Sequence, residues 1–316
     1  MLVRSGTSRL LLLDGMEVRP GKAGHDQVRR IMLGSDGHGG YGGRSSQENK
    51  VALVWSGVES GTFRFRFLQV IAQSGAILPM ECSNSASASA MLAQLGDDVG
   101  RPISIWKATN LSTGQKVELR PEPGPRIAKA WRVRFLASPA SREALAGLGG
   151  PCHVRVLGQR VEITPVALGN LFLFTKIDPT RLDSASSEMI ARAGMQAARA
   201  AGFSAPEGYH PKVIPYRITS NSSREVETAS YYHGELHHSM PGSAAMALAA
   251  YLEMHESRSR RESARWRIRH TSGSLEVRLG IEAGRGDFRL AWTEFSTPVS
   301  LLGWGVADLP RRLRRS

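Results

Sequence analysis

A cysteine stands directly in front of a run of very small side chains, in the segment ECSNSASASAM that begins at Glu81. An apolar stretch follows and ends at Gly96, which predicts a helix over roughly residues 85–95. A helix N-terminus carries partial positive charge and unpaired N–H groups, so it stabilises a thiolate and binds carboxylates. Small residues at 83–86 leave room for a carboxylate to reach those groups. Cys82 is therefore a candidate proton carrier, and the simpler alternative is an inert buried cysteine beside a capped helix.

A second segment of the same kind, PGSAAMALAAYLEMHE, begins at Pro241. It is apolar on nearly every side, which predicts a helix buried inside a curled sheet. The segment LGNLFLF around Gly169 also resembles SGTSRLLLL around Gly6, and the intervals from these glycines to Pro241 and Cys82 are similar. This weak repeat predicts two related halves whose helix N-termini face each other. We place the halves at 1–164 and 165–316, with the second helix N-terminus at Pro241-Gly242-Ser243.

Alternation of apolar and polar residues is the strongest pattern along the chain, and it predicts mainly antiparallel sheets with one buried face. The first strand is expected within MLVRSGTSRLLLLDG, and a further helix over about 184–201 with Gly202 as its cap. The clearest alternating segments are FRFRF at 63–67, WRVRF at 131–135, HVRV at 153–156, WRIR at 266–269 and LEVRL at 275–279.

The composition indicates a globular protein with an anionic partner. The 316 residues include 41 Lys and Arg against 28 Asp and Glu, a net charge of +13, which suits nucleic acid or a small polycarboxylate. No apolar run is long enough for a membrane span. Two cysteines, Cys82 and Cys152, cannot form a disulfide framework, so we expect a cytoplasmic protein.

Six motifs, in order along nearly the whole chain, resemble those of the PrpF branch of the diaminopimelate epimerase-like fold: VRSGTSRLLLL, IMLGSDGHGGYGGRSSQENKVALV, ECSNSASASA, VALGNLFLF, LHHSMPGSAA and RHTSGSLEV. The resemblance implies an α+β protein of two pseudo-symmetric halves, each a curled sheet around a central helix, with the active site between them. This branch contains double-bond isomerases and tautomerases of unsaturated tricarboxylates, such as aconitate isomerases, methylitaconate isomerase and oxalomesaconate tautomerase.

The resemblance also implies roles for individual residues. Cys82 and Lys50 would transfer the proton, because Lys50 falls where PrpF-like proteins carry a lysine implicated in this shift; which of the two is the acid stays open. The residues expected to hold the substrate are Thr7, Ser8, Arg9, Ser83, Asn84, Ser85, Asn170, His237, Gly242, Ser243, His270 and Ser272. Helix capping, strand packing and solvation are the structural alternatives at these positions. We expect no metal site and no cofactor, a small carboxylate as substrate, and leave a homodimer open.

Departures from the family pattern leave the substrate open. Ser83 stands in place of a glycine, Arg9 in place of a lysine, and Ala244 in place of a glycine. Pro241 stands where diaminopimelate epimerases carry their second thiol, which disfavours a two-thiol epimerase or racemase. Two alternatives remain: a tailoring isomerase of secondary metabolism acting on a different substrate, and a non-enzymatic binder of nucleic acid or another polyanion. Nucleic acid is disfavoured because no RNP-like stacking motif occurs.

Overall fold

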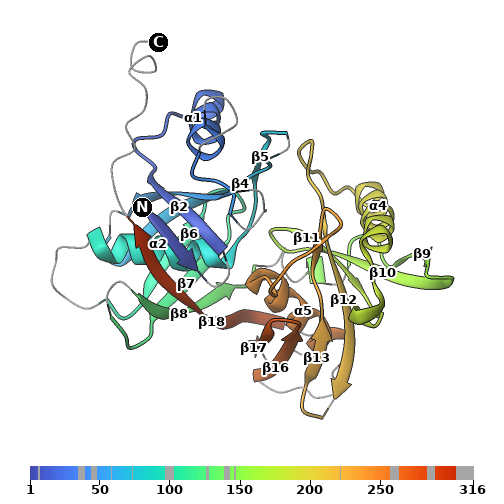
Figure 1. The fold of residues 1–316 in the computed structure, drawn as a ribbon. Coiled ribbons are helices and arrows are strands. Elements are labelled where there is room, and N and C mark those ends of the chain that lie inside the picture. Colours follow the sequence, from blue (N-terminus) through green and yellow to red (C-terminus); the bar gives the residue numbers. More distant parts are fainter. Residues whose placement is uncertain are drawn as a thin grey trace.

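Two buried helices, α2 (Ser83–Gly96) and α5 (Gly242–His255), form the centres of the two halves of the molecule (Figure 1). The computed structural model describes residues 1–5, 8–34, 40–43, 48–57, 59–72, 74–96, 103–125, 128–138, 143–145, 147–220, 222–256, 263–282 and 289–303. Strands surround α2 on one side of the picture and curve around α5 on the other. The α+β class and the mainly antiparallel pairing expected from the sequence are confirmed.

The N-terminal half is a closed barrel of eight strands around α2. Its wall runs from β1 through β2, β3, β4, β6, β7 and β8, and β18 (Arg289–Gly303) closes it by pairing with both β8 and β1. The remaining strands of this half are β1 (Leu2–Ser5), β2 (Ser8–Asp14), β3 (Lys50–Ser56), β4 (Thr62–Val70), β5 (Ile77–Pro79), β6 (Trp106–Asn110), β7 (Lys116–Pro121) and β8 (Ala128–Leu136).

The small side chains of α2 are explained by this barrel. An eight-stranded barrel is normally filled by side chains alone, so a helix fits inside only if its own side chains are very small. Every residue from Ser85 to Met91 is fully buried, and Ser87 Oγ lies 2.8 Å from Ser5 Oγ of the surrounding wall. The barrel wall supplies the bulky residues, with Phe63, Phe65 and Phe67 on its inner face and Arg64 exposed outside.

The C-terminal half is an open, curved sheet with α5 on one face and α4 (Ser184–Ala200) on the other (Figure 1). Residues 242–253 of α5 are all buried, as expected for a helix that is apolar on every side. The strands are β9 (Cys152–Val156), β10 (Gln159–Ala167), β11 (Leu171–Thr175), β12 (Lys212–Ser220), β13 (Glu225–Thr228), β14 (Tyr231–Tyr232), β15 (Glu235–Leu236), β16 (Ser263–His270) and β17 (Gly273–Glu282). A single 3-10 turn, Pro179–Arg181, precedes α4.

Three local expectations need correction. Helix α1 (Gly21–Leu33) was not expected; its Val28 and Met32 cover the outer face of β2, β3 and β4, but its other positions are mostly polar. The N-terminal segment forms a hairpin of two strands, β1 and β2, where one strand was expected. Helix α2 begins at Ser83, two residues earlier than expected, so Cys82 immediately precedes it. No helix in the described ranges has the length and apolar character needed to cross a bilayer.

Candidate active site

A small cavity of about 30 Å³ lies where the N-terminal end of α2 meets the C-terminal half. It is lined by Lys50, Phe67, Gln69, Met80, Glu81, Cys82, Lys212, Tyr232 and His237. Three residues expected from the sequence, Cys82, Lys50 and His237, therefore come together, although they are far apart in the chain. The cavity thus combines the thiol of Cys82 with the amines of Lys50 and Lys212, which are groups suited to proton transfer.

Lys50 is held in place by Ser8 of β2, which also contacts the N-terminal end of α2. Its Nζ donates a 2.6 Å hydrogen bond to Ser8 Oγ in the neighbouring strand β2, and Lys50 is only 8% exposed. Asn84 Nδ2 donates to the same Ser8 oxygen at 3.1 Å, and Asn84 Oδ1 accepts from Thr297 Oγ1 of β18 at 3.3 Å. This chain of hydrogen bonds fixes a cation beside the helix N-terminus. Ser8 and Asn84 thus act through Lys50 and do not themselves line the cavity.

Glu81 is a buried carboxyl group beside Cys82 that the sequence analysis did not select. Its Oε2 accepts from Asn110 Nδ2 at 2.8 Å and from Thr113 Oγ1 at 2.7 Å, and its Oε1 accepts from the backbone N–H of Cys82 at 3.2 Å. Burial raises the pKa of Glu81 to about 7, against the lowering effect of these hydrogen bonds and of the charge of Lys212.

Asn170 connects the second half to this segment. Its Nδ2 donates to the Glu81 carbonyl at 2.8 Å, and its Oδ1 accepts from the Glu81 N–H at 3.2 Å. Gly169 lies against the same residue: a Cβ atom there would lie 2.6 Å from the Glu81 Cβ, and its φ of +67° favours glycine. Asn170, expected as a substrate ligand, instead positions the backbone that leads to Cys82.

The raised pKa of Glu81 makes the stability of the protein depend on pH. Folded Glu81 holds its proton to higher pH than unfolded Glu81, so this contribution to the free energy of unfolding is complete below about pH 4.5 and is lost as the pH rises to about 7. We expect that loss, about 3 kcal/mol, to be absent in Glu81→Gln. Urea unfolding of both proteins at several pH values between 4.5 and 8 measures the difference; two parallel stability curves would contradict the assignment.

Lys212, the first residue of β12, supplies a second amine from the C-terminal half. Burial is the largest cause that lowers the pKa of this amine, to about 8; Lys50 lowers it further, while the negative charges of Cys82 and Glu81 raise it. Lys212 as a whole residue is partly exposed, but its amine end is enclosed. Lys212 was not expected from the sequence, although KVIPY at 212–216 resembles KVALV at 50–54. In both segments a lysine is the first residue of a buried strand.

Two further side chains of the cavity come from the segment before α5. His237 Nδ1 lies 2.6 Å from the Ser239 carbonyl, which can only accept, so Nδ1 carries the proton. Burial and the charges of Lys50 and Lys212 lower the pKa of His237 to about 3, which keeps the ring neutral at pH 7. The hydroxyl of Tyr232 is buried and has no hydrogen-bond partner among the described residues. A buried donor of this kind favours a ligand that accepts a hydrogen bond.

The N-terminal ends of α2 and α5 lie against each other, as the repeat predicted. A Cβ atom on Gly242 would lie 2.5 Å from Ser83 Oγ and 2.3 Å from the Phe295 ring, so only glycine fits here. The Ser85 hydroxyl donates to the Cys82 carbonyl at 2.7 Å, a contact at the first turn of α2. Ser243 is buried and lines a different cavity of about 40 Å³. None of Ser83, Ser85 and Ser243 lines the cavity of Cys82.

Other residues expected at the site lie elsewhere. Arg9 alternates with Ser8 and points away from the cavity, where its Nη2 lies 3.5 Å from the Tyr41 carbonyl and 3.6 Å from Glu48 Oε1. Strand β16 ends at His270, which is near enough to His237 to help lower its pKa. Ser272 is exposed in the turn that follows. Thr7 lies outside the described residues.

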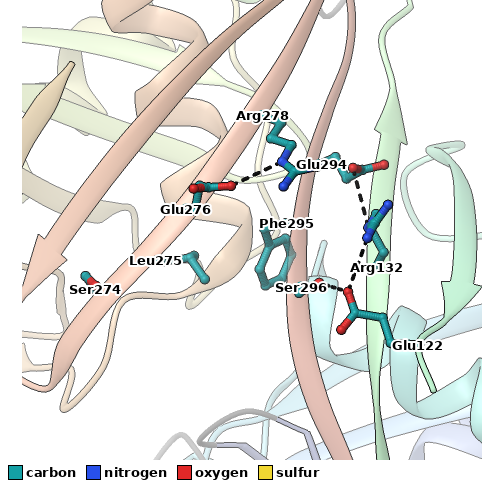
Figure 2. A pocket seen from close by; sticks show the side chains of 9 residues that line it. All are labelled: Glu122, Arg132, Ser274, Leu275, Glu276, Arg278, Glu294, Phe295 and Ser296. Carbon is teal, nitrogen blue, oxygen red and sulfur yellow. Dashed lines mark hydrogen bonds and ion pairs between the residues drawn. The ribbon is translucent and has the colours of Figure 1, made fainter. Parts of the chain in front are cut away.

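In a larger pocket of about 160 Å³ between β8, β17 and β18, the charges of the arginines are balanced by those of neighbouring glutamates (Figure 2). Its two arginines are paired with carboxylates: Arg132 with Glu122 at 3.6 Å, and Arg278 with Glu276 at 3.1 Å. Ser296 also donates to Glu122 at 2.5 Å. These internal pairs leave little attraction for an anionic ligand, so the smaller cavity is the better candidate. No group of three metal-ligating side chains occurs in the described part of the chain.

The comparisons with known proteins are at the level of structure. No family model and no curated protein matches the sequence. A methylitaconate-delta-isomerase structure has a TM-score of 0.60 at 14% identity, with 97% of each chain covered. A probable proline racemase from Agrobacterium radiobacter K84 has a TM-score of 0.62 at 14% identity, over 98% of this chain and 93% of that one. A hydroxyproline epimerase from Agrobacterium vitis has a TM-score of 0.58 at 14% identity, over 96% of this chain and 88% of that one. The protein therefore has the diaminopimelate epimerase-like fold that its motifs predicted.

Proposed function

We propose that the protein is a cofactor-independent isomerase that moves a proton along an unsaturated di- or tricarboxylate, shifting a double bond or interconverting keto and enol forms. The observation that carries this proposal is the cavity in which the Cys82 thiol, at the N-terminal end of α2, meets the amines of Lys50 and Lys212. The similar structures of an isomerase, an epimerase and a probable racemase support the same class of reaction.

The chemistry needs a base, an acid and donors for the charge that develops on the substrate. Cys82 is the proposed proton carrier, and Lys50 is the second proton-transfer residue that the sequence resemblance implies. The positive end of α2 and the amine of Lys50 stabilise negative charge on a substrate carboxylate or enolate. Tyr232 would donate the hydrogen bond that its hydroxyl lacks within the described structure. A cavity of about 30 Å³ holds at most a few water molecules, so substrate entry requires its walls to move.

The substrate is proposed to be a small carboxylate and not nucleic acid or another macromolecular polyanion. On the outer face of β16 and β17, four arginines are paired with two glutamates: Arg265 and Arg278 with Glu276, and Arg267 and Arg269 with Glu225. This surface therefore alternates in charge, which weakens the attraction for nucleic acid. An enzyme of this kind suits the cytoplasmic location expected from the sequence, and both cysteines are free thiols in the structure.

A second candidate within the same fold is a tailoring isomerase whose substrate carries fewer carboxylates. The observation in its favour is Arg9, which is paired with Glu48 and directed away from the cavity. Without Arg9, the cations that line the cavity are Lys50 and Lys212. Two amines suit one or two carboxylates better than three.

Proton NMR in deuterated water tests the proposal. We expect purified protein to incorporate solvent deuterium at the allylic carbon of at least one compound from a panel of cis-aconitate, trans-aconitate, itaconate, mesaconate and matching monocarboxylates. Exchange with the monocarboxylates alone would favour the tailoring isomerase. Absence of exchange with every compound, from a protein whose unfolding transition shows it to be folded, would falsify the proposed function.

A further inference from the structure

The two lysines of the cavity occupy equivalent positions in the two halves of the fold. Lys50 is the first residue of β3 and pairs in parallel with Leu10 of β2. Lys212 is the first residue of β12 and pairs in parallel with Phe172 of β11. Strands β2 and β11 are the ones that follow the repeated glycines Gly6 and Gly169 in the sequence. The internal repeat therefore directs one amine into the cavity from each half.

The surroundings of the two amines differ. Lys50 is fixed as a hydrogen-bond donor to Ser8 at 2.6 Å. Within the described residues, Lys212 Nζ makes no hydrogen bond; it lies over the Phe172 ring, 6.0 Å from its centre. Its charge interacts with those of Cys82 and Glu81, which line the same cavity. The amine of Lys50 is thus fixed in position by Ser8, whereas the amine of Lys212 has no hydrogen-bond acceptor among the described residues and is available to a substrate.

We propose that Lys212 is a further catalytic residue, the acid–base group that works with Cys82 across the cavity, and that Lys50, the partner expected from the sequence, serves instead as the fixed cation that holds the substrate. This inference rests on the proposed function. Cys82 thiolate removes a proton from one allylic carbon, and the electron pair of the C–H bond moves into the conjugated carboxylate system. The ammonium of Lys212 donates a proton to the other allylic carbon and becomes a neutral amine. Transfer of the proton from the Cys82 thiol to this amine, through water, restores the starting state without any oxidant or cofactor.

The amine also has a suitable proton affinity. Because burial lowers the pKa of Lys212 to about 8, a large fraction of the amine changes its charge within one pH unit of neutrality. A general acid or base is most effective when its pKa lies near the working pH. Lys212 is therefore able to exchange a proton near neutral pH.

Two substitutions distinguish a proton carrier from a simple cation. Lys212→Arg keeps the positive charge but cannot release a proton near neutral pH, and Lys212→Met removes both properties at similar length. We expect either change to lower kcat for deuterium exchange by about 10²-fold. We also expect the pH–rate profile to lose its inflection near pH 8 in Lys212→Arg. Lys176→Arg, at an exposed ion pair with Glu256, is the control and should leave exchange unchanged.

A second measurement does not depend on the substrate. The rate at which iodoacetamide alkylates Cys82, with Cys152 resolved from it by peptide mass spectrometry, reports the stabilisation of the thiolate. We expect alkylation at pH 7 to be slowed about three- to tenfold by Lys212→Met and to stay within about twofold in Lys212→Arg. Both variants must show wild-type thermal unfolding for the comparison to hold.

The outcomes separate the two proposals. Exchange by Lys212→Arg within about fivefold of the wild-type rate, with the inflection near pH 8 retained, overturns the role of Lys212. A wild-type protein that exchanges with no compound overturns the proposed function, and alkylation then tests only whether the charge of Lys212 acts on Cys82. Slower alkylation in Lys212→Met alone supports that contact, which the inference requires, and equal alkylation in all three proteins rejects the inference.

Discussion

The Cys82→Ser protein is expected to exchange substrate protons with solvent about 10³-fold more slowly than the wild type. A serine hydroxyl has nearly the size of a thiol but does not ionise near neutral pH, so it cannot carry the proton. The substitution changes only the side chain at the start of α2, so the hydrogen bond from the Ser85 hydroxyl to the Cys82 carbonyl is kept. Deuterium incorporation measured by proton NMR, at saturating concentration of whichever compound exchanges, gives the rate.

The second cysteine provides the matched control for this prediction. Cys152, the first residue of β9, lies on the sheet covered by α4 and does not line the cavity. Cys152→Ser should therefore exchange at the wild-type rate. Equal losses in the two variants would point to a general effect on folding, and retention of exchange in Cys82→Ser would assign the proton transfer to the lysines alone.

Removal of the Glu253 carboxylate is expected to lower the free energy of unfolding by about 3–5 kcal/mol. Glu253, near the end of α5, is buried and accepts from Arg224 Nε at 2.9 Å and Arg224 Nη2 at 3.1 Å. It also accepts from the buried Trp266 Nε1 at 2.9 Å. Glu253→Ala would leave a largely buried guanidinium and an indole N–H without this acceptor, and both effects destabilise the folded state.

A neighbouring glutamate tests whether burial causes this effect. Glu256 follows α5 and pairs with Lys176 at 2.9 Å, but this pair is solvent-exposed. Glu256→Ala should therefore lower the free energy of unfolding by about 1 kcal/mol at most. Urea unfolding of the two variants and the wild type gives the comparison. Similar losses in both variants would mean that the buried network contributes no more than a surface ion pair.

The sequence predicted the two central helices by different routes. The apolar character of α5 on every side predicted its burial within a sheet, whereas the central place of α2 was implied only by the family resemblance. The small residues of α2 were expected to give a substrate access to the helix N-terminus. In the structure they also allow the helix to fit inside the barrel. Helix α1 was missed because only Val28 and Met32 mark its buried face in an otherwise polar segment.

The site could be predicted only where local motifs carry it. Cys82 and Lys50 stand in recognisable motifs, and the structure brings both to one cavity. Lys212 and Tyr232 lie in strands outside the six motifs, so only the tertiary fold shows that they line the cavity of Cys82. Arg9 shows the opposite case: its type suits a carboxylate, but the alternation of β2 turns it to the other face from Ser8.

The closure of the barrel by β18 bears on how the chain folds. Strand β1 begins at Leu2, and Leu2 pairs with Gly303 of β18. The first and last described strands of the chain are therefore neighbours in one barrel. During synthesis, β1 can pair with β2 at once, but the barrel stays open until β18 (Arg289–Gly303) has left the ribosome. Pairings of such high sequence separation slow folding, and they leave strand edges exposed to aggregation in the meantime. A chain that stops short of β18 would therefore lack the barrel of its N-terminal half, although every residue of β1 to β8 is present.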